Sequence, residues 1–170
     1  HMAPHIESRS ESFPQGKSMI VCATRRICVR LHDMLKEIHP EWYDERDNEG
    51  VMKVIMTGSA SDNWQEHIRN STRRGQLGDR FRDPDDDFRI AIVCDMWLTG
   101  FDAPSLTTMY IDKPMKGHGL IQALARVNRA FKDKTGGLVV DYFGLSARIA
   151  EAVNLYTASK GRGSIVVDIE

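Results

Sequence analysis

The sequence has no long hydrophobic run, and its apolar segments are about as long as a β-strand. A membrane-spanning helix needs about 20 consecutive apolar residues, so no contact with a membrane is predicted. A charged leader followed by an apolar segment, which would direct secretion, is also absent. We therefore expect a cytoplasmic protein, and His1-Met2 is typical of the remnant of a purification tag.

Cysteine and excess charge are scarce as well. The 170 residues contain three cysteines, none in a C-x-x-C spacing, so we expect buried reduced thiols and no metal site. The formal net charge is -1. Because a domain that grips DNA by itself usually carries a basic excess, any contact with nucleic acid is predicted to be local.

Short apolar runs rich in β-branched residues alternate with amphipathic helical patterns from about Lys17 onward. This alternation predicts an α/β fold, a parallel sheet with helices on both faces. The predicted strands are 18–23, 51–57, 88–94, 106–111 and 137–142. The predicted helices are 25–38, capped by Thr24, then 62–72 capped by Asp62, 74–81, 120–131 and 145–158.

One domain is predicted, over residues 17–160. Residues 1–16 are polar, contain two prolines and lack periodicity, so we interpret them as a flexible lead-in. Gly161 and Gly163 interrupt the pattern after the last predicted helix. We interpret residues 161–170 as the truncated start of a following segment of a longer protein.

Residues 95–104, DMWLTGFDAP, are predicted to form a loop, and a plain turn would not need such a sequence. It follows the carboxyl end of a predicted strand, where open α/β sheets bind ligands. Gly100 lets the backbone approach a ligand, and Pro104 fixes the exit from the loop. Trp97 and Leu98 are apolar, so they must pack either within their own domain or against a partner.

The predicted helix 120–131 contains QALARVNR, residues 122–129. Gln122, Arg126 and Arg129 project from one face of this helix. A separate apolar face for the core is supplied by Leu120, Ile121, Leu124 and Val127. Two guanidinium groups on a shared face suit a polyphosphate, although exposed arginine pairs of this kind are also common. Spacing alone therefore leaves both interpretations open.

The helix QALARVNR resembles motif VI of superfamily 2 helicases, and TGFDAP upstream of it resembles their motif V. The stretch from Ile92 to Gly144 resembles the motor (R) subunit of type I restriction-modification enzymes. A weaker likeness begins at Ser18, where MIVCATRRICVRLHDML resembles the motif IV strand and helix. The resemblance implies a RecA-like C-terminal helicase lobe from an ATP-dependent double-stranded-DNA translocase, part of a type I site-specific deoxyribonuclease.

The resemblance also implies roles for individual residues. Arg126 and Arg129 are expected to contact the phosphates of ATP as arginine fingers, and Gln122 to help order them. Gly100 and Asp102 are expected to line the same nucleotide cleft. The residues expected to contact the DNA backbone, which carries no sequence information, are Thr99, Thr24, Arg25, Thr57 and Gly58. A basic segment, Lys113, Lys116 and His118, is a further candidate for this surface.

The chain lacks the G-x-x-x-x-G-K-[ST] loop that a complete helicase motor needs. Gly16-Lys17-Ser18 is not such a loop, because Glu11 occupies the first glycine position and the segment precedes a strand. We therefore predict that the chain alone cannot hydrolyse ATP. The implied partners are double-stranded DNA, the methylation and specificity subunits, and a first RecA-like lobe of the same parent chain that binds most of ATP and Mg²⁺.

Three other interpretations fit parts of the sequence. The chain could be a non-catalytic α/β interaction module, the equivalent lobe of another superfamily 2 helicase, or a complete small nucleotide-hydrolysing protein. The motor interpretation predicts that Arg126 and Arg129 are accessible to solvent at one edge of the sheet. Burial of either arginine in a salt bridge within the domain would contradict it.

Overall fold

The computed structural model describes residues 2–115, 117–129, 131–132, 136–144, 147, 150–151, 154 and 164–169. Its centre is a six-stranded sheet in the order β2-β3-β1-β4-β5-β6, and all the pairings are parallel. The strands are β1 (Lys17–Cys22), β2 (Met52–Ile55), β3 (Ile90–Val93), β4 (Leu106–Asp112), β5 (Gly136–Asp141) and β6 (Ser164–Ile169). The predicted α/β fold class is confirmed.

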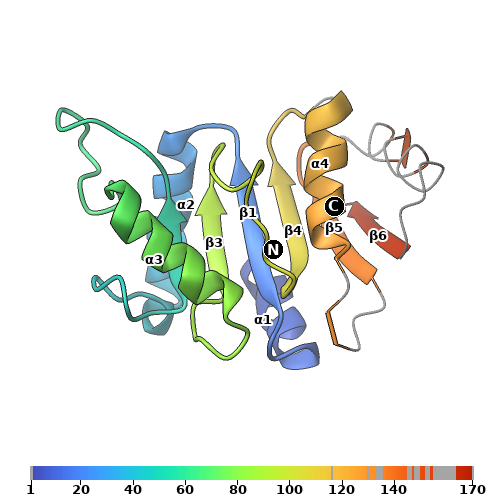
Figure 1. The fold of residues 1–170 in the computed structure, drawn as a ribbon, viewed down its shortest axis with the longest axis horizontal. Helices are drawn as coiled ribbons and strands as arrows, with labels where there is room; N and C mark the ends of the chain where they lie inside the picture. The colour runs from blue at the N-terminus through green and yellow to red at the C-terminus, as the bar shows by residue number, and fades with distance from the viewer. Residues whose placement is uncertain are drawn as a thin grey trace.

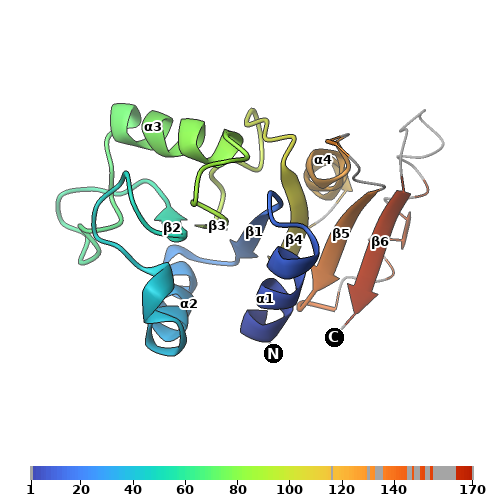
Figure 2. The same cartoon turned by 90° about the horizontal axis from the view of Figure 1, so that it is seen from below.

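Helices cover both faces of the sheet (Figures 1 and 2). The helices are α1 (Met2–Ser12), α2 (Arg25–Ile38), the short 3-10 helix η1 (Pro40–Trp42), α3 (Ser71–Arg82) and α4 (Gly117–Val127). Figure 2 shows α3 and α4 on one face and α1 and α2 on the other. Side chains of β1 alternate between the two faces, so Met19 packs in one core cluster and Ile20 in the other.

Residues 2–12 form α1, so the prediction of a flexible lead-in is wrong for them. Ile6 is 1% exposed and packs with Ala3 in the core on the α2 side of the sheet. The Nδ1 atom of His5 lies 2.9 Å from the hydroxyl of Tyr110 in β4. Pro4 is tolerated because backbone N–H groups of a first helical turn have no partner within the helix. Contacts with distant strands stabilise this polar helix.

The segment before α3 also differs from the prediction. Asp62 does not cap a helix; its carboxylate accepts a hydrogen bond from the backbone N–H of Ser59 at 2.7 Å. The cap of α3 is Asn70, whose side chain accepts from the N–H of Arg73 at 2.9 Å. A single helix therefore covers the predicted helix 74–81 and begins only at Ser71.

The sheet continues past residue 160, the predicted end of the domain. β6 pairs with β5 along its whole length, from Gly136 opposite Ser164 to Asp141 opposite Ile169. The run that we interpreted as the start of a following segment is therefore a strand of the same sheet. The predicted helix 145–158 lies mostly outside the described residues. None of the helices in the described part of the chain has the length and apolar character of a membrane span.

Candidate functional site

A loop of residues 94–105 connects β3 to β4 and crosses the sheet face between α3 and α4 (Figure 1). The rings of Trp97 and Phe101 stack at 4.1 Å with an interplanar angle of 6°. Phe81 of α3 lies 5.4 Å from Trp97, and Phe88 lies 6.4 Å from it. Trp97 and Leu98 are buried. Of the two alternatives left by the sequence, packing within the same domain is the one that the structure shows.

The backbone of this loop turns its polar residues outward. Trp97 and Gly100 have φ values of 67° and 71°, in the left-handed region, within a run of bends and turns over residues 94–100. Phe101 is buried, while Thr99, Gly100 and Asp102 are exposed. The aromatic side chains thus anchor the loop and leave its polar positions open to a ligand.

The predicted helix 120–131 is observed as α4, which ends at Val127. Arg126 lies in its last turn, but Arg129 lies two residues beyond its end, so the prediction that both project from one helix face is wrong for Arg129. Both arginines contact the same loop. The Nε–H of Arg126 donates a hydrogen bond to the carbonyl oxygen of Leu98 at 2.7 Å. Arg129 forms an ion pair with Asp102 at 3.2 Å, in which the two side chains are 54% and 50% exposed. Partial burial lowers the pKa of Arg126, and the carboxylate of Asp102 opposes this shift. The guanidinium of Arg126 nevertheless remains charged at any physiological pH.

The polar face of α4 borders a hollow of about 340 Å³, lined by Gln122, Ala125, Arg126, Asn128 and Arg129. Gln122 and Arg126 are half-buried and Arg129 is exposed. Among the residues that the structure describes, neither arginine forms a buried ion pair, which would have contradicted the motor interpretation. The face offers several N–H donors and two positive charges to an anion of the size of a phosphate chain.

The arginine end of α4 lies near the amino end of β5. A Cβ atom on Gly137 would come within 2.3 Å of the carbonyl oxygen of Val127, so the end of the helix rests directly on the start of the strand. Thr24 and Thr57, in contrast, follow the carboxyl ends of β1 and β2. The predicted site residues therefore form two groups at opposite edges of the sheet.

The second group is tied together by Arg25. Its guanidinium donates to the carbonyl oxygen of Thr57 at 3.0 Å and to the carboxylate of Asp62 at 3.1 Å. The hydroxyl oxygen of Thr24 accepts from the N–H of Ile27 at 3.2 Å, which caps α2. A Cβ atom on Gly58 would lie 2.4 Å from the side chain of Ile68. Asp62 offsets part of the charge that Arg25 could present to a phosphate.

Two side chains that the sequence did not single out for this role hold the loop in place. Arg82 of α3 lies 4.5 Å from the ring of Phe101 and donates to the carbonyl oxygen of Asp102 at 3.1 Å. Lys113 donates to the carbonyl oxygen of Cys94 at 3.0 Å and pairs with Asp95, so it braces the loop. Lys116 lies outside the described residues. These contacts join residues too distant in sequence for any spacing to reveal them.

The sequence predicts that Lys17 does not belong to a phosphate-binding loop, and the structure agrees. It begins β1, is fully buried, and its Nζ donates to the carbonyl oxygens of Asp86 and Phe88, both at 2.7 Å. Burial, together with the nearby charge of Arg89, lowers the pKa of Lys17 to about 8. The amine of Lys17 therefore binds backbone carbonyl groups inside the fold and does not face a ligand.

Solved structures that share this fold include domains of helicases. The C-terminal domain of the DEAD-box protein Dbp5 has a TM-score of 0.55 and 17% identity, over 98% of this chain and 84% of that one. Domain 2 of the DEAD-box helicase Mss116p, bound to an RNA duplex, has a TM-score of 0.54 and 16% identity, over 98% of this chain and 57% of that one. The chain thus has the fold of RecA-like C-terminal helicase domains.

Comparison of sequences narrows this class. A sequence profile described as type I restriction enzyme subunit R domain 3 matches residues 31–144. The type I restriction enzyme HindI endonuclease subunit of Haemophilus influenzae is 48% identical over 98% of the chain. The MjaIXP endonuclease subunit of Methanocaldococcus jannaschii is 40% identical over 98% of the chain. The chain belongs to the family of type I restriction enzyme R subunits, and it spans 16% and 15% of these two relatives.

Proposed function

We propose that this chain is the second motor lobe of an ATP-dependent double-stranded-DNA translocase within a type I restriction endonuclease. In this proposal Arg126 and Arg129 contact the phosphates of ATP, which is held mainly by a first RecA-like lobe of the same parent chain. The observation that carries it is the open surface at the end of α4, where the guanidinium groups of Arg126 and Arg129 border one hollow of about 340 Å³. The methylation and specificity subunits of a type I system would be the other partners.

The contacts of the two arginines suit them to this task. The hydrogen bond from Nε of Arg126 to Leu98 fixes the plane of the guanidinium, so its outer edge is preoriented toward a phosphate oxygen. Arg129 is half exposed and can exchange Asp102 for a phosphate. Gln122 lies on the same face and helps to order the two groups.

The residues present fit the phosphates of ATP better than its metal ion. Guanidinium and amide N–H groups bind phosphate oxygens, whereas Mg²⁺ requires oxygen ligands. The carboxylate beside this hollow, Asp102, is already paired with Arg129. We therefore place Mg²⁺ with the first lobe. Hydrolysis of ATP supplies the free energy for movement, and the residues of this chain stabilise charge and position the phosphates.

The test is ATP hydrolysis by the full-length R subunit, assembled with its methylation and specificity subunits and stimulated by DNA. Arg129→Ala and Arg126→Ala should each lower the rate by on the order of 10³-fold, as removal of an arginine finger does. Arg30→Ala is the matched control, because Arg30 is an exposed arginine on α2, across the sheet. Unchanged hydrolysis in both α4 variants would reject the finger role and favour a non-catalytic interaction module.

We further propose that Thr99, Thr24, Arg25, Thr57 and Gly58 face the DNA backbone. The hydroxyl of Thr24 accepts a hydrogen bond to cap α2 and still has its own proton to donate to a phosphate. Gly58 keeps the backbone free of a side chain that would collide with Ile68. In the same assembly, Thr57→Ala should weaken DNA binding equally for all sequences and leave the rate at saturating DNA unchanged. A loss restricted to one DNA sequence would contradict a backbone contact.

A further inference from the structure

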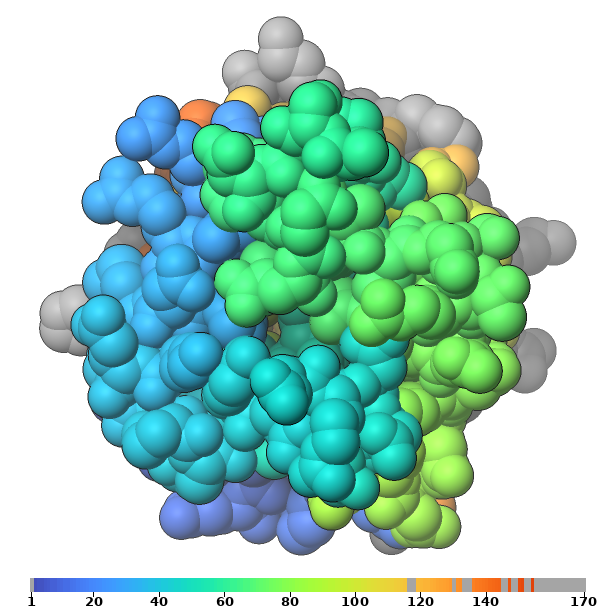
Figure 3. Space-filling model, turned by 90° about the vertical axis from the view of Figure 1, so that its left-hand side faces the viewer, coloured from blue at the N-terminus to red at the C-terminus, as the bar shows by residue number. Residues whose placement is uncertain are grey.

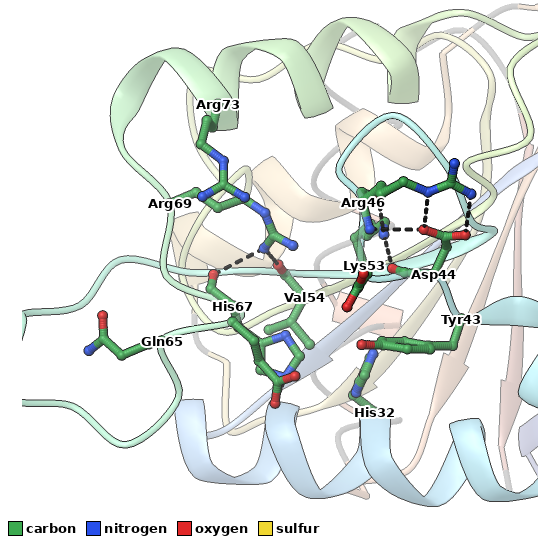
Figure 4. A pocket seen from close by; sticks show the side chains of 12 residues that line it. His32, Tyr43, Asp44, Arg46, Lys53, Val54, Gln65, His67, Arg69 and Arg73 are labelled. Atoms are coloured by element: carbon green, nitrogen blue, oxygen red, sulfur yellow. Dashed lines mark hydrogen bonds and ion pairs between the residues drawn. The ribbon is translucent and has the colours of Figure 1, made fainter.

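The free edge of β2 borders a second hollow, separate from the arginine face. β2 is one of the two edge strands of the sheet, and the surface beside it is visibly indented (Figure 3). The pocket has a volume of about 400 Å³ and lies between α2, the segment 43–46 and the segment 65–73. Figure 4 shows His32 and His67 on one side of it and the cations Arg46, Lys53 and Arg69 on the other.

Two histidine rings meet at the base of this pocket. His32 comes from α2 and His67 from the segment before α3, and their ring centroids lie 4.6 Å apart. Each histidine is 3% exposed. The Nε2 atom of His67 is buried, and it makes no hydrogen bond with any residue that the structure describes. A buried ring nitrogen without a hydrogen bond is costly unless something binds it.

Each imidazole has a carboxylate beside it. The Nδ1 atom of His32 lies 3.3 Å from Oδ1 of Asp33, and the Nε2 atom of His67 lies 3.5 Å from Oε1 of Glu66. One ligand atom from each of His32, Asp33 and His67 lies within 4.8 Å of the others. Asp33 and Glu66 have side chains that are 58% and 60% exposed, so both carboxylates can rotate toward the imidazoles.

We propose that His32, His67, Asp33 and Glu66 form a binding site for a divalent transition-metal ion, with Zn²⁺ as the ion that it fits best. Imidazole nitrogen and carboxylate oxygen bind Zn²⁺ at about 2.0–2.2 Å, which places neighbouring ligands of a tetrahedral site about 3.3 Å apart. The two nitrogen–oxygen separations of 3.3 and 3.5 Å match this edge. Imidazole ligands favour such ions over Mg²⁺ or Ca²⁺.

The charges around the pocket decide how well it can hold a cation. Arg69 and Arg73 also line the pocket and would repel a cation; they share one carboxylate, Asp47, at 2.5 and 2.6 Å, which offsets part of their charge. The two carboxylates would balance the charge of the ion.

The ion would have a structural role. Four protein ligands close a tetrahedral site, whereas a catalytic zinc keeps one position open. The ligands come from α2 and from the segment that leads into α3; this segment runs along the β2 edge, and α3 lies on the other face of the sheet. A metal ion would therefore fasten the two layers to each other around the β2 edge. This inference does not depend on the proposed motor function.

The test is a calorimetric titration of the 170-residue chain with ZnCl₂, repeated with CoCl₂ under an absorption spectrometer. We expect one ion per chain, and at least roughly 10-fold weaker binding in His67→Gln and His32→Gln. The control is His39→Gln, because His39 also lies beside two carboxylates, Glu7 at 3.5 Å and Glu41 at 3.0 Å. His39 is not grouped with a second histidine in the described part of the chain, whereas His32 and His67 are grouped together. The His39 variant should therefore bind Zn²⁺ as the parent chain does.

Three outcomes would overturn the site. The first is no binding by the parent chain, and the second is an unchanged affinity in the His67 variant. The third is thiolate-to-cobalt charge-transfer absorption, which would assign the ion to the cysteines. If circular dichroism shows that the buried histidine variants do not fold, Asp33→Asn provides the test at an exposed position. Equal affinity of Asp33→Asn and the parent chain would then reject the site.

Discussion

The two faces of the sheet are packed with different side chains. On the face of α3 and α4, the rings of Phe81 and Phe88 pack against Trp97 and Phe101 of the loop 94–105. On the face of α1 and α2, the core consists mostly of cysteine, methionine and aliphatic side chains, as with Cys28 and Leu35. A helix holds its own shape through backbone hydrogen bonds, whereas an irregular loop has few. Large rings supply the fixed support that the loop needs to present polar residues in one geometry.

The largest effect is expected at the centre of the aromatic cluster. Trp97→Ala should lower the free energy of unfolding by about 3–5 kcal/mol, because it leaves a cavity beside Phe81 and Phe101. Urea unfolding of the chain measures this loss. Ile6→Ala, on the opposite face, should cost about 2–4 kcal/mol. In the assembled enzyme at a temperature where both variants are folded, only Trp97→Ala should lower ATP hydrolysis. Equal loss in both would mean that the aromatic support is not specific to the loop.

A smaller effect is expected where α4 rests on β5. Gly137→Ala places a Cβ atom 2.3 Å from the backbone of Val127, so the end of α4 must shift. We expect a loss of about 1–3 kcal/mol in unfolding free energy and a lower rate of ATP hydrolysis, because Arg126 and Arg129 move with the helix. Gly75→Ala is the control: it lies in α3, and no atom lies within 4 Å of the added Cβ. That variant should gain up to about 1 kcal/mol. Unaltered hydrolysis in Gly137→Ala would show that the helix position is not critical.

The smallest effect, for a change of one pH unit, concerns Lys17 on the aromatic side. Lys17 lies 6.0 Å from the ring of Phe81, and its pKa falls from 10.5 to about 8. Between these values the unfolded chain binds more protons than the folded one, so stability should rise with pH. The contribution is at most about 1.4 kcal/mol per pH unit. Urea unfolding at a series of pH values should show a shallower rise in Lys17→Met. If the free energy of unfolding changed with pH equally in Lys17→Met and in the parent chain, the buried position of Lys17 would not be lowering its pKa.

Much of the fold could be predicted because the strands are short apolar runs separated by amphipathic helices. The helix α1 could not, since it has few apolar residues and is stabilised by contacts such as that of His5 with Tyr110. The start of α3 was also missed, because Asp62 and Asn70 are equally good caps by residue type. Tertiary contacts, with Asp62 bonded to Arg25, decide between them.

The residues of the candidate site followed from the likeness to helicase motifs, but their contacts did not. No spacing indicates that Arg126 bonds to the backbone of Leu98, because that contact depends on the path of the loop over the sheet. The contact between His32 and His67 was even harder to predict from the sequence. His32 and His67 belong to different elements and are each unremarkable in sequence, so only the packing of α2 against the segment before α3 brings them together.

Arg126, in the last turn of α4, and Arg129, just beyond its end, have partners that differ in charge. The carbonyl of Leu98 is neutral, so Arg126 keeps its whole positive charge, while Asp102 cancels much of the charge of Arg129. Raising the ionic strength screens the exposed pair of Arg129 and Asp102 and loosens it, but it hardly affects the hydrogen bond of Arg126. One guanidinium therefore stays in place across salt conditions, and the other becomes freer to turn as salt is added.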